Sequence, residues 1–214
     1  MNNFEYIVSS LPVLTPEYRY SAGESYSETL EEIRAQLSRK DAAVMDFLLK
    51  GFNAEALNKD FYAEALSHSN AFIREFFRFD LNLRNAKVRY INRRLGRPSE
   101  QDTISGKGLE DDSKLDIDGY RFNAGEFHEA AKVESTLSLS DLISREKGLD
   151  EVTWEKADAL TTFHYFDLTA VLGFIVKLHI VDRWISLDPE SGRQLFRRLV
   201  DQVRGTFKGV NYTE

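Results

Sequence analysis

The 214-residue chain contains no cysteine, only four prolines and only twelve glycines. Without cysteine it forms no disulfide, offers no thiolate nucleophile and holds no cysteine-ligated metal, which fits a reducing compartment. Because prolines and glycines are few, long stretches lack a residue that ends a helix, and strand-like alternation is hard to find after the first fourteen residues. We therefore predict an all-α protein. Residues 4–14 fit a strand or extended arm as well as a helix.

Signals for secretion and for nucleic-acid binding are also missing. The sequence MNNFEYIVSSLPVL begins the chain without the basic segment and long apolar core of a secretory signal, so we expect a cytoplasmic location. The net charge of −7 disfavours nonspecific binding of nucleic acid by the whole chain.

Motifs for catalysis and ion binding are scarce. Gly106-Lys107 is followed by Gly108, where a phosphate-binding loop has Ser or Thr. Asp116 and Asp118 have the spacing of a calcium loop, but the residues at its two ends are not ligands. No His-Glu-x-x-His spacing occurs. We expect neither a cofactor nor a metal site.

The most apolar part of the chain is LTAVLGFIVKLHIVDRWISL, residues 168–187. A membrane-spanning helix needs about 20 predominantly apolar residues, but Lys177 ends the uncharged part and Asp182 and Arg183 follow. Because such charges are costly at bilayer depth, we expect no direct membrane insertion. A helix this apolar should instead be surrounded by other helices.

Start and stop signals divide the rest of the chain into helices within a single domain, 1–214. Ser25 and Asp41 have N-cap positions and Gly51 a C-cap position. The stretch 59–95 has neither proline nor glycine, which predicts one helix of about 55 Å or two helices with a kink. The other predicted elements are a long loop over 96–125, one long helix over 151–187, and shorter helices over 126–135, 141–147 and 188–205.

An internal similarity links the two long stretches. Residues 76–81 (FFRFDL) and 163–168 (FHYFDL) agree at four of six positions. This predicts two copies of one helical module, over 25–97 and 126–205, joined by a loop over 98–125. A pair of long helices cannot bury its apolar faces alone, and a second copy would complete the core.

Three segments carry a resemblance to known proteins. They are YIVSSLPVL near the start, FDLNLRN in the middle, and KGLDEVTWEKAD with HYFDLTAVLGFIVKLHIVDRW near the end. The chain resembles an uncharacterised bacterial family encoded among V-type ATPase subunit genes. The segment from Phe79 to Arg84 also resembles part of the V-type ATPase C subunit, the d-type socket between the central stalk and the membrane ring.

The C subunit is all helical and is built from three related bundles arranged as a funnel. The resemblance therefore implies a shortened, two-module socket whose partners are other V-type ATPase subunits, the central stalk and the membrane ring. It also implies a location peripheral to the inner membrane, reached through those partner subunits.

A charge pair is expected in the middle of the chain. Helical spacing puts Arg84 in the apolar stripe of Phe77, Leu81, Val88, Ile91 and Leu95. A buried guanidinium needs a carboxylate. Asp80 lies one turn earlier, and Asp167 is its counterpart in the second copy, so we expect Arg84 to pair with one of them.

A basic surface is predicted after this pair, from Lys87, Arg89, Arg93, Arg94 and Arg97. Three interpretations are open: a solvated face, a docking surface for an acidic protein partner, and a nucleic-acid site. Nucleic acid is the least favoured, because the aromatic residues do not alternate with the arginines.

The sequence favours a non-catalytic subunit of a V-type ATPase or ATP synthase that links the central stalk to the membrane ring during proton or sodium transport. One alternative is a freestanding, metal-dependent helical enzyme using Glu126 and His128. Another is a generic helical adaptor protein.

Overall fold

The structure is a computed structural model in which residues 4–104 and 127–187 are described. Of these residues, 69% are helical and none lies in a strand. The all-α prediction is therefore confirmed for the described part of the chain. The predicted helix over 188–205 and most of the predicted loop over 96–125 lie outside the described residues.

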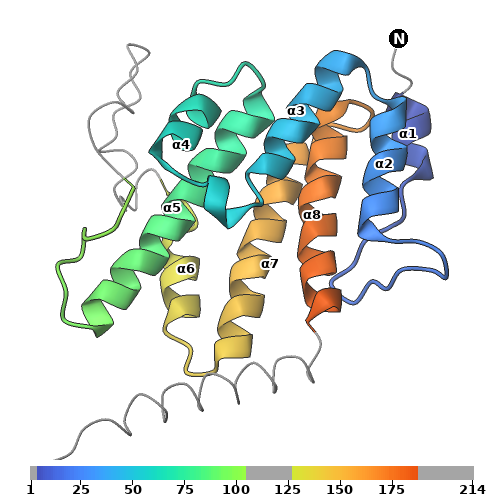
Figure 1. Ribbon diagram of the computed structural model, residues 1–214. Coiled ribbons are helices and arrows are strands. Elements are labelled where there is room, and N and C mark those ends of the chain that lie inside the picture. Colours follow the sequence, from blue (N-terminus) through green and yellow to red (C-terminus); the bar gives the residue numbers. More distant parts are fainter. Residues whose placement is uncertain (1–3, 105–126, 188–214) are drawn as a thin grey trace, which may run out of the picture.

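The described residues form eight α-helices and one short 3-10 helix (Figure 1). The elements are α1 (Phe4–Ser10), α2 (Tyr26–Gln36), α3 (Arg39–Lys50), η1 (Ala54–Ala56), α4 (Lys59–Leu66), α5 (Ala71–Arg94), α6 (Ala130–Leu137), α7 (Leu142–Thr161) and α8 (Leu168–Ser186). The segment left open by its sequence, 4–14, thus begins with a helix.

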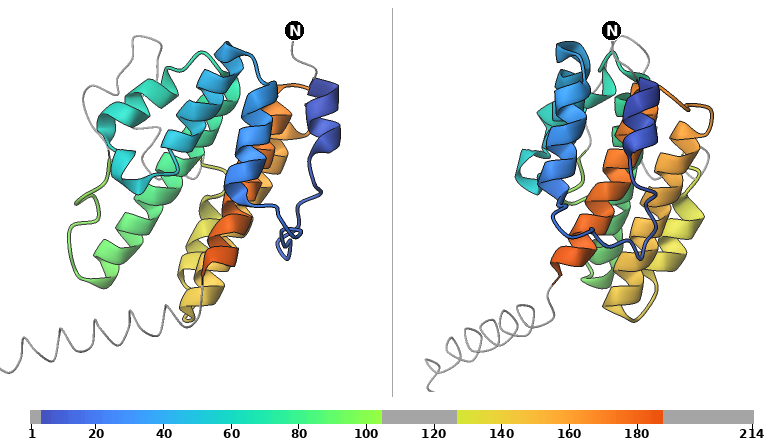
Figure 2. Two further views of the ribbon diagram at one scale, coloured as in Figure 1. Left: turned by 45° about the vertical axis from the view of Figure 1, so that its right-hand side comes forward. Right: turned by 90° about the vertical axis from the view of Figure 1, so that its right-hand side faces the viewer.

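Three long helices, α5, α7 and α8, form the centre of the bundle. Helix α7 packs against α8 and runs antiparallel to it, while α4 and α6 pack against α5 (Figure 1). Helices α1, α2 and α3 pack against α8 on its other side (Figure 2). The apolar helix α8 is therefore enclosed by neighbours, as its composition predicted. No helix in the described ranges is long and apolar enough to cross a membrane.

Side-chain caps fix where the early helices begin and end. Ser25 accepts a hydrogen bond from the N–H of Glu28, as predicted, and Gly51 ends α3. The predicted cap at Asp41 is wrong by one turn, because Ser38 is the N-cap and accepts from the N–H of Asp41 at 3.2 Å.

The stretch 59–95 forms two helices, the second of the predicted alternatives. Between α4 and α5, Asn70 caps α5 by accepting from the N–H of Ile73 at 3.2 Å. Arg74 stabilises the break by donating to the carbonyl of His68 at 2.6 Å. Short polar side chains at 67–70 compete with the helical backbone for its hydrogen bonds, which explains why the helix stops without proline or glycine.

The prediction of one helix over 151–187 is wrong. Helix α7 begins at Leu142, so it absorbs the predicted short helix over 141–147, and the chain then turns back at 162–167 before α8. Gly148 does not end a helix but lies inside α7, where its missing side chain allows α6 to approach closely. A Cβ atom at this position would lie 2.7 Å from Cγ2 of Thr136. Asp167 ends the turn by capping α8.

The internal similarity is not a structural repeat. Phe79 is buried in the middle of α5, whereas Phe166 is exposed in the turn before α8. Asp80 and Asp167 are accordingly a mid-helix residue and an N-cap. The hydrophobic core also joins the two predicted modules, since residues of α3, α4 and α5 pack with residues of α7 and α8.

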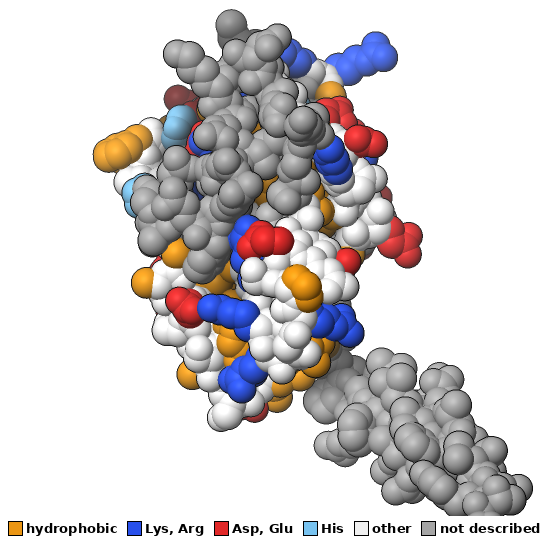
Figure 3. Space-filling view, turned by 90° about the vertical axis from the view of Figure 1, so that its left-hand side faces the viewer, with side chains coloured by type: hydrophobic (Ala, Val, Ile, Leu, Met, Phe, Trp, Pro, Cys, Tyr) orange, Lys and Arg blue, Asp and Glu red, His pale blue; other side chains and the backbone are white. Residues whose placement is uncertain are grey.

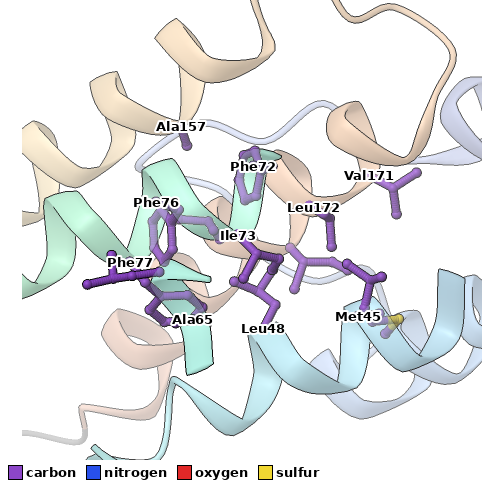
Figure 4. Close-up of a cluster of buried hydrophobic side chains, with 14 of the residues drawn as sticks. Met45, Leu48, Ala65, Phe72, Ile73, Phe76, Phe77, Ala157, Val171 and Leu172 are labelled. Atoms are coloured by element: carbon purple, nitrogen blue, oxygen red, sulfur yellow. The ribbon is translucent and has the colours of Figure 1, made fainter. Parts of the chain in front are cut away.

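The main core contains side chains of α1–α5, α7 and α8, and Figure 4 shows part of it. Its members include Met45 and Leu48 of α3, Ala65 of α4, Phe72, Ile73, Phe76 and Phe77 of α5, Ala157 of α7, and Val171 and Leu172 of α8. A second cluster fills the space among α5, α6 and α7. Its members include Phe79, Leu83, Phe127, Val133, Leu149 and Val152.

The chain after α5 folds back along that helix as far as it is described. Buried Asn85 exchanges two hydrogen bonds with the backbone of Ile104, at 3.1 and 3.0 Å. Buried Asn92 donates to the carbonyls of Ser99 and Gln101, at 3.2 and 2.6 Å. Two buried asparagines of α5 thus hold the beginning of the predicted loop against the bundle.

Candidate protein-interaction surface

A polar pocket of about 180 Å³ lies among α5, α7 and α8. Its lining includes Asp80, Arg84 and Lys87 of α5, Asp150 and Thr153 of α7, and His179 and Arg183 of α8. Pockets that bind small molecules usually have volumes of about 300–1,000 Å³. The pocket contains several ionisable groups but is smaller than the usual pocket for a small-molecule substrate.

One polar cluster on this pocket contains the predicted charge pair. Nε of Arg84 donates to Oδ2 of Asp80 at 2.8 Å, and the hydroxyl of buried Tyr62 donates to the same oxygen at 2.6 Å. Burial raises the pKa of Tyr62, and the neighbouring Asp80 carboxylate raises it further. The ion pair is thus formed within α5, but Tyr62 was not expected from the sequence.

The predicted burial of Arg84 is wrong, because its side chain is 41% exposed while that of Asp80 is 16% exposed. Asp167 lies elsewhere and pairs with His164, whose Nδ1 is 2.5 Å from Oδ2 of Asp167. Although burial alone would raise the pKa of Asp167, the bonds from His164 and from the N–H of Ala170 lower it.

A second cluster on the pocket joins α7 to α8. Asp150 accepts hydrogen bonds from Nε1 of Trp184, at 2.6 Å, and from Arg183. Burial raises the pKa of Asp150, against the opposing effect of Arg183. Since both carboxylates on the pocket are already bonded to local partners, the clusters tie helices together rather than present a free acid or base.

His179 also serves packing. Its ring stacks on Phe52 with centroids 4.1 Å apart, and its Nδ1 lies 3.4 Å from the hydroxyl of Tyr26. Burial lowers the pKa of His179 and so favours the neutral ring. Burial, and to a smaller extent the nearby Asp182 carboxylate, raises the pKa of Tyr26 to about 12. The histidine thereby holds α2 and the chain after α3 against α8.

The residues considered for a metal-dependent enzyme do not meet in the described structure. His128 is exposed in the turn before α6, and Glu126 lies outside the described residues. Within 4–104 and 127–187, no group of three or more His, Cys, Asp or Glu side chains is arranged to hold a metal ion.

The predicted basic surface is smaller than expected. Arg89 is buried and forms a two-pronged ion pair with Glu100 at 2.8 Å, so it belongs to the fold and not to the surface. Arg89 is buried because the segment after α5 folds back along that helix and brings Glu100 beside it. Helical periodicity in the sequence does not predict this contact. Lys87 is half-buried and lies 3.9 Å from Glu146.

The remaining three basic residues, Arg93, Arg94 and Arg97, are exposed at the end of α5. Arg93 lies 3.3 Å from Glu134 of α6, and Arg94 donates to the hydroxyl of Tyr90 at 2.9 Å. Exposed pairs of this kind contribute about 0–1 kcal/mol, so they give way easily to a partner.

Apolar side chains are exposed beside these arginines. Ile91 and Leu95, expected in the buried stripe, are 52% and 57% exposed because no helix within 4–104 and 127–187 covers the last turn of α5. Leu139, Leu142 and Ile143 are exposed at the turn from α6 to α7, and Leu187 is exposed after α8. Figure 3 shows Lys and Arg side chains among apolar ones over this part of the molecule. We call these six apolar residues with Arg93, Arg94 and Arg97 the basic-apolar end.

The opposite end of the bundle carries exposed aromatic rings. Phe163 is 85% exposed in the turn between α7 and α8, and Tyr165 and Phe166 of the same turn are also exposed. A neighbouring pocket of about 320 Å³ is lined by apolar residues, including Val8 and Val13, and by His164 and Lys177. The 20 residues of α7 separate this aromatic turn from the basic-apolar end by about 30 Å. The predicted single helix over 151–187 missed this turn, although Asp167 is a favourable N-cap residue.

Comparison with known proteins identifies a family. A family model described as "Protein of unknown function (DUF2764)" matches residues 53–206, which is well over half of the chain. No curated protein and no solved structure matches the chain. The match begins just before η1 and includes α4–α8, so both exposed ends described above lie within it. The chain therefore belongs to the DUF2764 family of proteins of unknown function.

Proposed function

We propose that the protein is a non-catalytic helical subunit that joins two protein partners through the opposite ends of its bundle. The observation that carries this proposal is the pair of exposed apolar surfaces, one basic and one aromatic, about 30 Å apart along α7. Exposed apolar groups gathered in a patch mark contact surfaces more often than do single exposed residues.

The composition of each end suits a protein partner. Arginine and aromatic residues are enriched at protein interfaces and supply many of their energetically important contacts. Arg93, Arg94 and Arg97 give the basic-apolar end a positive charge, in a chain whose net charge is −7. We propose that this end binds a partner surface that is acidic at its rim and apolar at its centre.

The polar pocket supports a structural role better than a catalytic one. Its carboxylates, Asp80 and Asp150, are each bonded to two donors from the same fold. A general acid or base needs an atom free to exchange a proton with substrate.

The resemblance to proteins encoded among V-type ATPase genes is the reason for proposing particular partners. We propose that they are the central stalk and the membrane ring of a V-type ATPase or ATP synthase. In this proposal the protein lies on the cytoplasmic side and reaches the membrane only through these subunits. It would transmit no proton or sodium ion itself.

Reversing one charge at the basic-apolar end tests the proposal. In Arg94→Glu, we expect at least about a tenfold loss of co-purification with ATPase subunits from native membranes, because a rim repulsion of about 1.4 kcal/mol weakens binding tenfold. The melting temperature should stay unchanged, since Arg94 is exposed.

Arg19→Glu is the matched control, because Arg19 is exposed in the segment between α1 and α2. Figure 1 shows this segment on the other side of the bundle from α5. It changes the net charge equally and should leave co-purification intact. Normal assembly of Arg94→Glu, or capture of no ATPase subunit by the wild-type chain, contradicts the proposal.

A further inference from the structure

The apolar residues of the basic-apolar end form a surface that the described helices leave uncovered. Leu142 and Ile143 begin α7, Leu139 lies just before them, and Leu95 follows α5. Interactions between helices bring these positions together: Arg93 pairs with Glu134 of α6. The guanidinium of Arg145 in α7 lies 5.7 Å from the ring centre of Tyr90 in α5.

The chain leaves the described structure at the edge of this surface. Nζ of Lys147 lies 5.7 Å from the ring centre of Trp184, and Trp184 donates a hydrogen bond to Asp150. The last turn of α8 is therefore beside the second and third turns of α7. Exposed Leu187 follows directly, so the described chain ends on the side of the bundle where α7 begins and where Leu142 and Ile143 are exposed.

The sequence that follows predicts an amphipathic helix of suitable length. Asp188 and Pro189 have the N-cap and first-turn positions of a helix that Gly205 would end. At 100° per residue, five apolar side chains fall within an arc of about 140°. These are Leu195, Phe196, Leu199, Val200 and Val203.

The reach of this helix matches the width of the uncovered surface. At 1.5 Å per residue, positions 195–203 lie about 12–24 Å from residue 187. Neighbouring helices pack about 8–10 Å apart, so the same reach crosses from α7 past α6 toward the end of α5. The family match extends to residue 206, so the shared unit includes this segment as well as the surface.

We propose that residues 188–205 form a helix that packs across the basic-apolar end of its own chain, with Leu199 at the centre of its buried stripe. The segment covers Leu139, Leu142 and Ile143. It leaves Ile91 and Leu95 exposed beside the arginines, where the proposed partner would bind. The inference goes beyond the proposed function and does not depend on it, because it concerns the isolated chain.

The absence of natural cysteine allows a direct test by thiol labelling. In the full-length chain carrying Ile143→Cys, the proposal expects slow reaction with a maleimide. Adding Leu199→Asp should release the segment and speed the reaction about tenfold, as expected when a docked population of about 90% is lost. Arg198→Asp, on the opposite face of the predicted helix, should leave the rate of the Ile143→Cys chain unchanged.

A second labelling site controls for unfolding and for effects on the whole molecule. Phe163→Cys lies at the other end of α7, and its reaction rate should be the same with and without Leu199→Asp. Equal rates for Ile143→Cys with and without Leu199→Asp would overturn the proposal. Protection that appears only at high protein concentration, or only with added lipid vesicles, would also overturn it by showing a second copy or a membrane as the occupant.

This outcome is separable from the proposed function. A failed labelling test would not contradict binding of ATPase subunits by the basic-apolar end. A failed co-purification would not contradict the packing of residues 188–205 measured by labelling.

Discussion

Removing the Tyr62 hydroxyl should destabilise the protein more than removing the charge of Arg84. Tyr62 is fully buried and donates to Asp80 at 2.6 Å, and a hydrogen bond to a charged group contributes about 1.5–3 kcal/mol. Asp80 retains Arg84 and some contact with water in Tyr62→Phe. We therefore expect a loss of about 2 kcal/mol in the free energy of unfolding.

Arg84→Leu should cost about 1 kcal/mol, because the guanidinium is 41% exposed and Asp80 keeps the bond from Tyr62. Had Arg84 been buried in the apolar stripe, the cost would be about 3 kcal/mol. The double variant should lose more than the sum of the single changes, by about 1 kcal/mol, because only then is the Asp80 carboxylate left without either donor.

Equilibrium unfolding in urea, followed by far-UV circular dichroism, measures all three variants. The slope against urea should stay constant, so that shifts in midpoint report stability. Arg94→Leu is the control and should cost less than about 0.5 kcal/mol, since Arg94 is exposed. Strictly additive losses would refute a shared carboxylate, and a larger loss for Arg84→Leu than for Tyr62→Phe would refute the assigned burial.

Two further predictions use the same unfolding assay. Because the pKa of Tyr62 is raised by folding, the native state keeps a proton that the unfolded state loses above about pH 10. The free energy of unfolding should therefore fall as the pH rises above about 10, and it should fall less in Tyr62→Phe. Equal pH dependence of the two proteins from about pH 9 to 11 would contradict the burial of the tyrosine beside a carboxylate. Gly51→Ala should cost about 1–3 kcal/mol, because its methyl group would overlap the fully buried ring of Phe77, whereas unchanged stability would show that the core yields there without strain.

Local interactions in this protein were predictable from the sequence because they depend on residues one helical turn apart. The cap at Ser25, the end of α3 at Gly51 and the Asp80–Arg84 pair are of this kind. The burial of α8 was predictable for a different reason: nearly all of its faces are apolar, so any packing arrangement must enclose it.

Tertiary packing decided features for which the same local signals allow several outcomes. Periodicity placed Ile91 and Leu95 on one face with Phe77, but burial requires a neighbour, and the last turn of α5 has none among the described helices. Arg89 is buried because the returning chain brings Glu100 beside it, although its sequence neighbours resemble those of exposed Arg93.

The turn between α7 and α8 shows the same division. The capping ability of Asp167 is a property of the sequence, but a continuous helix would have satisfied the backbone equally well. Folding back lets α8 bury Val171, Leu172 and Ile175 against other helices, at the cost of exposing Phe163. Sequence by itself therefore determined helical class and local pairs, while the tertiary structure decided which helix ends remain uncovered, because burial depends on neighbours distant in the chain.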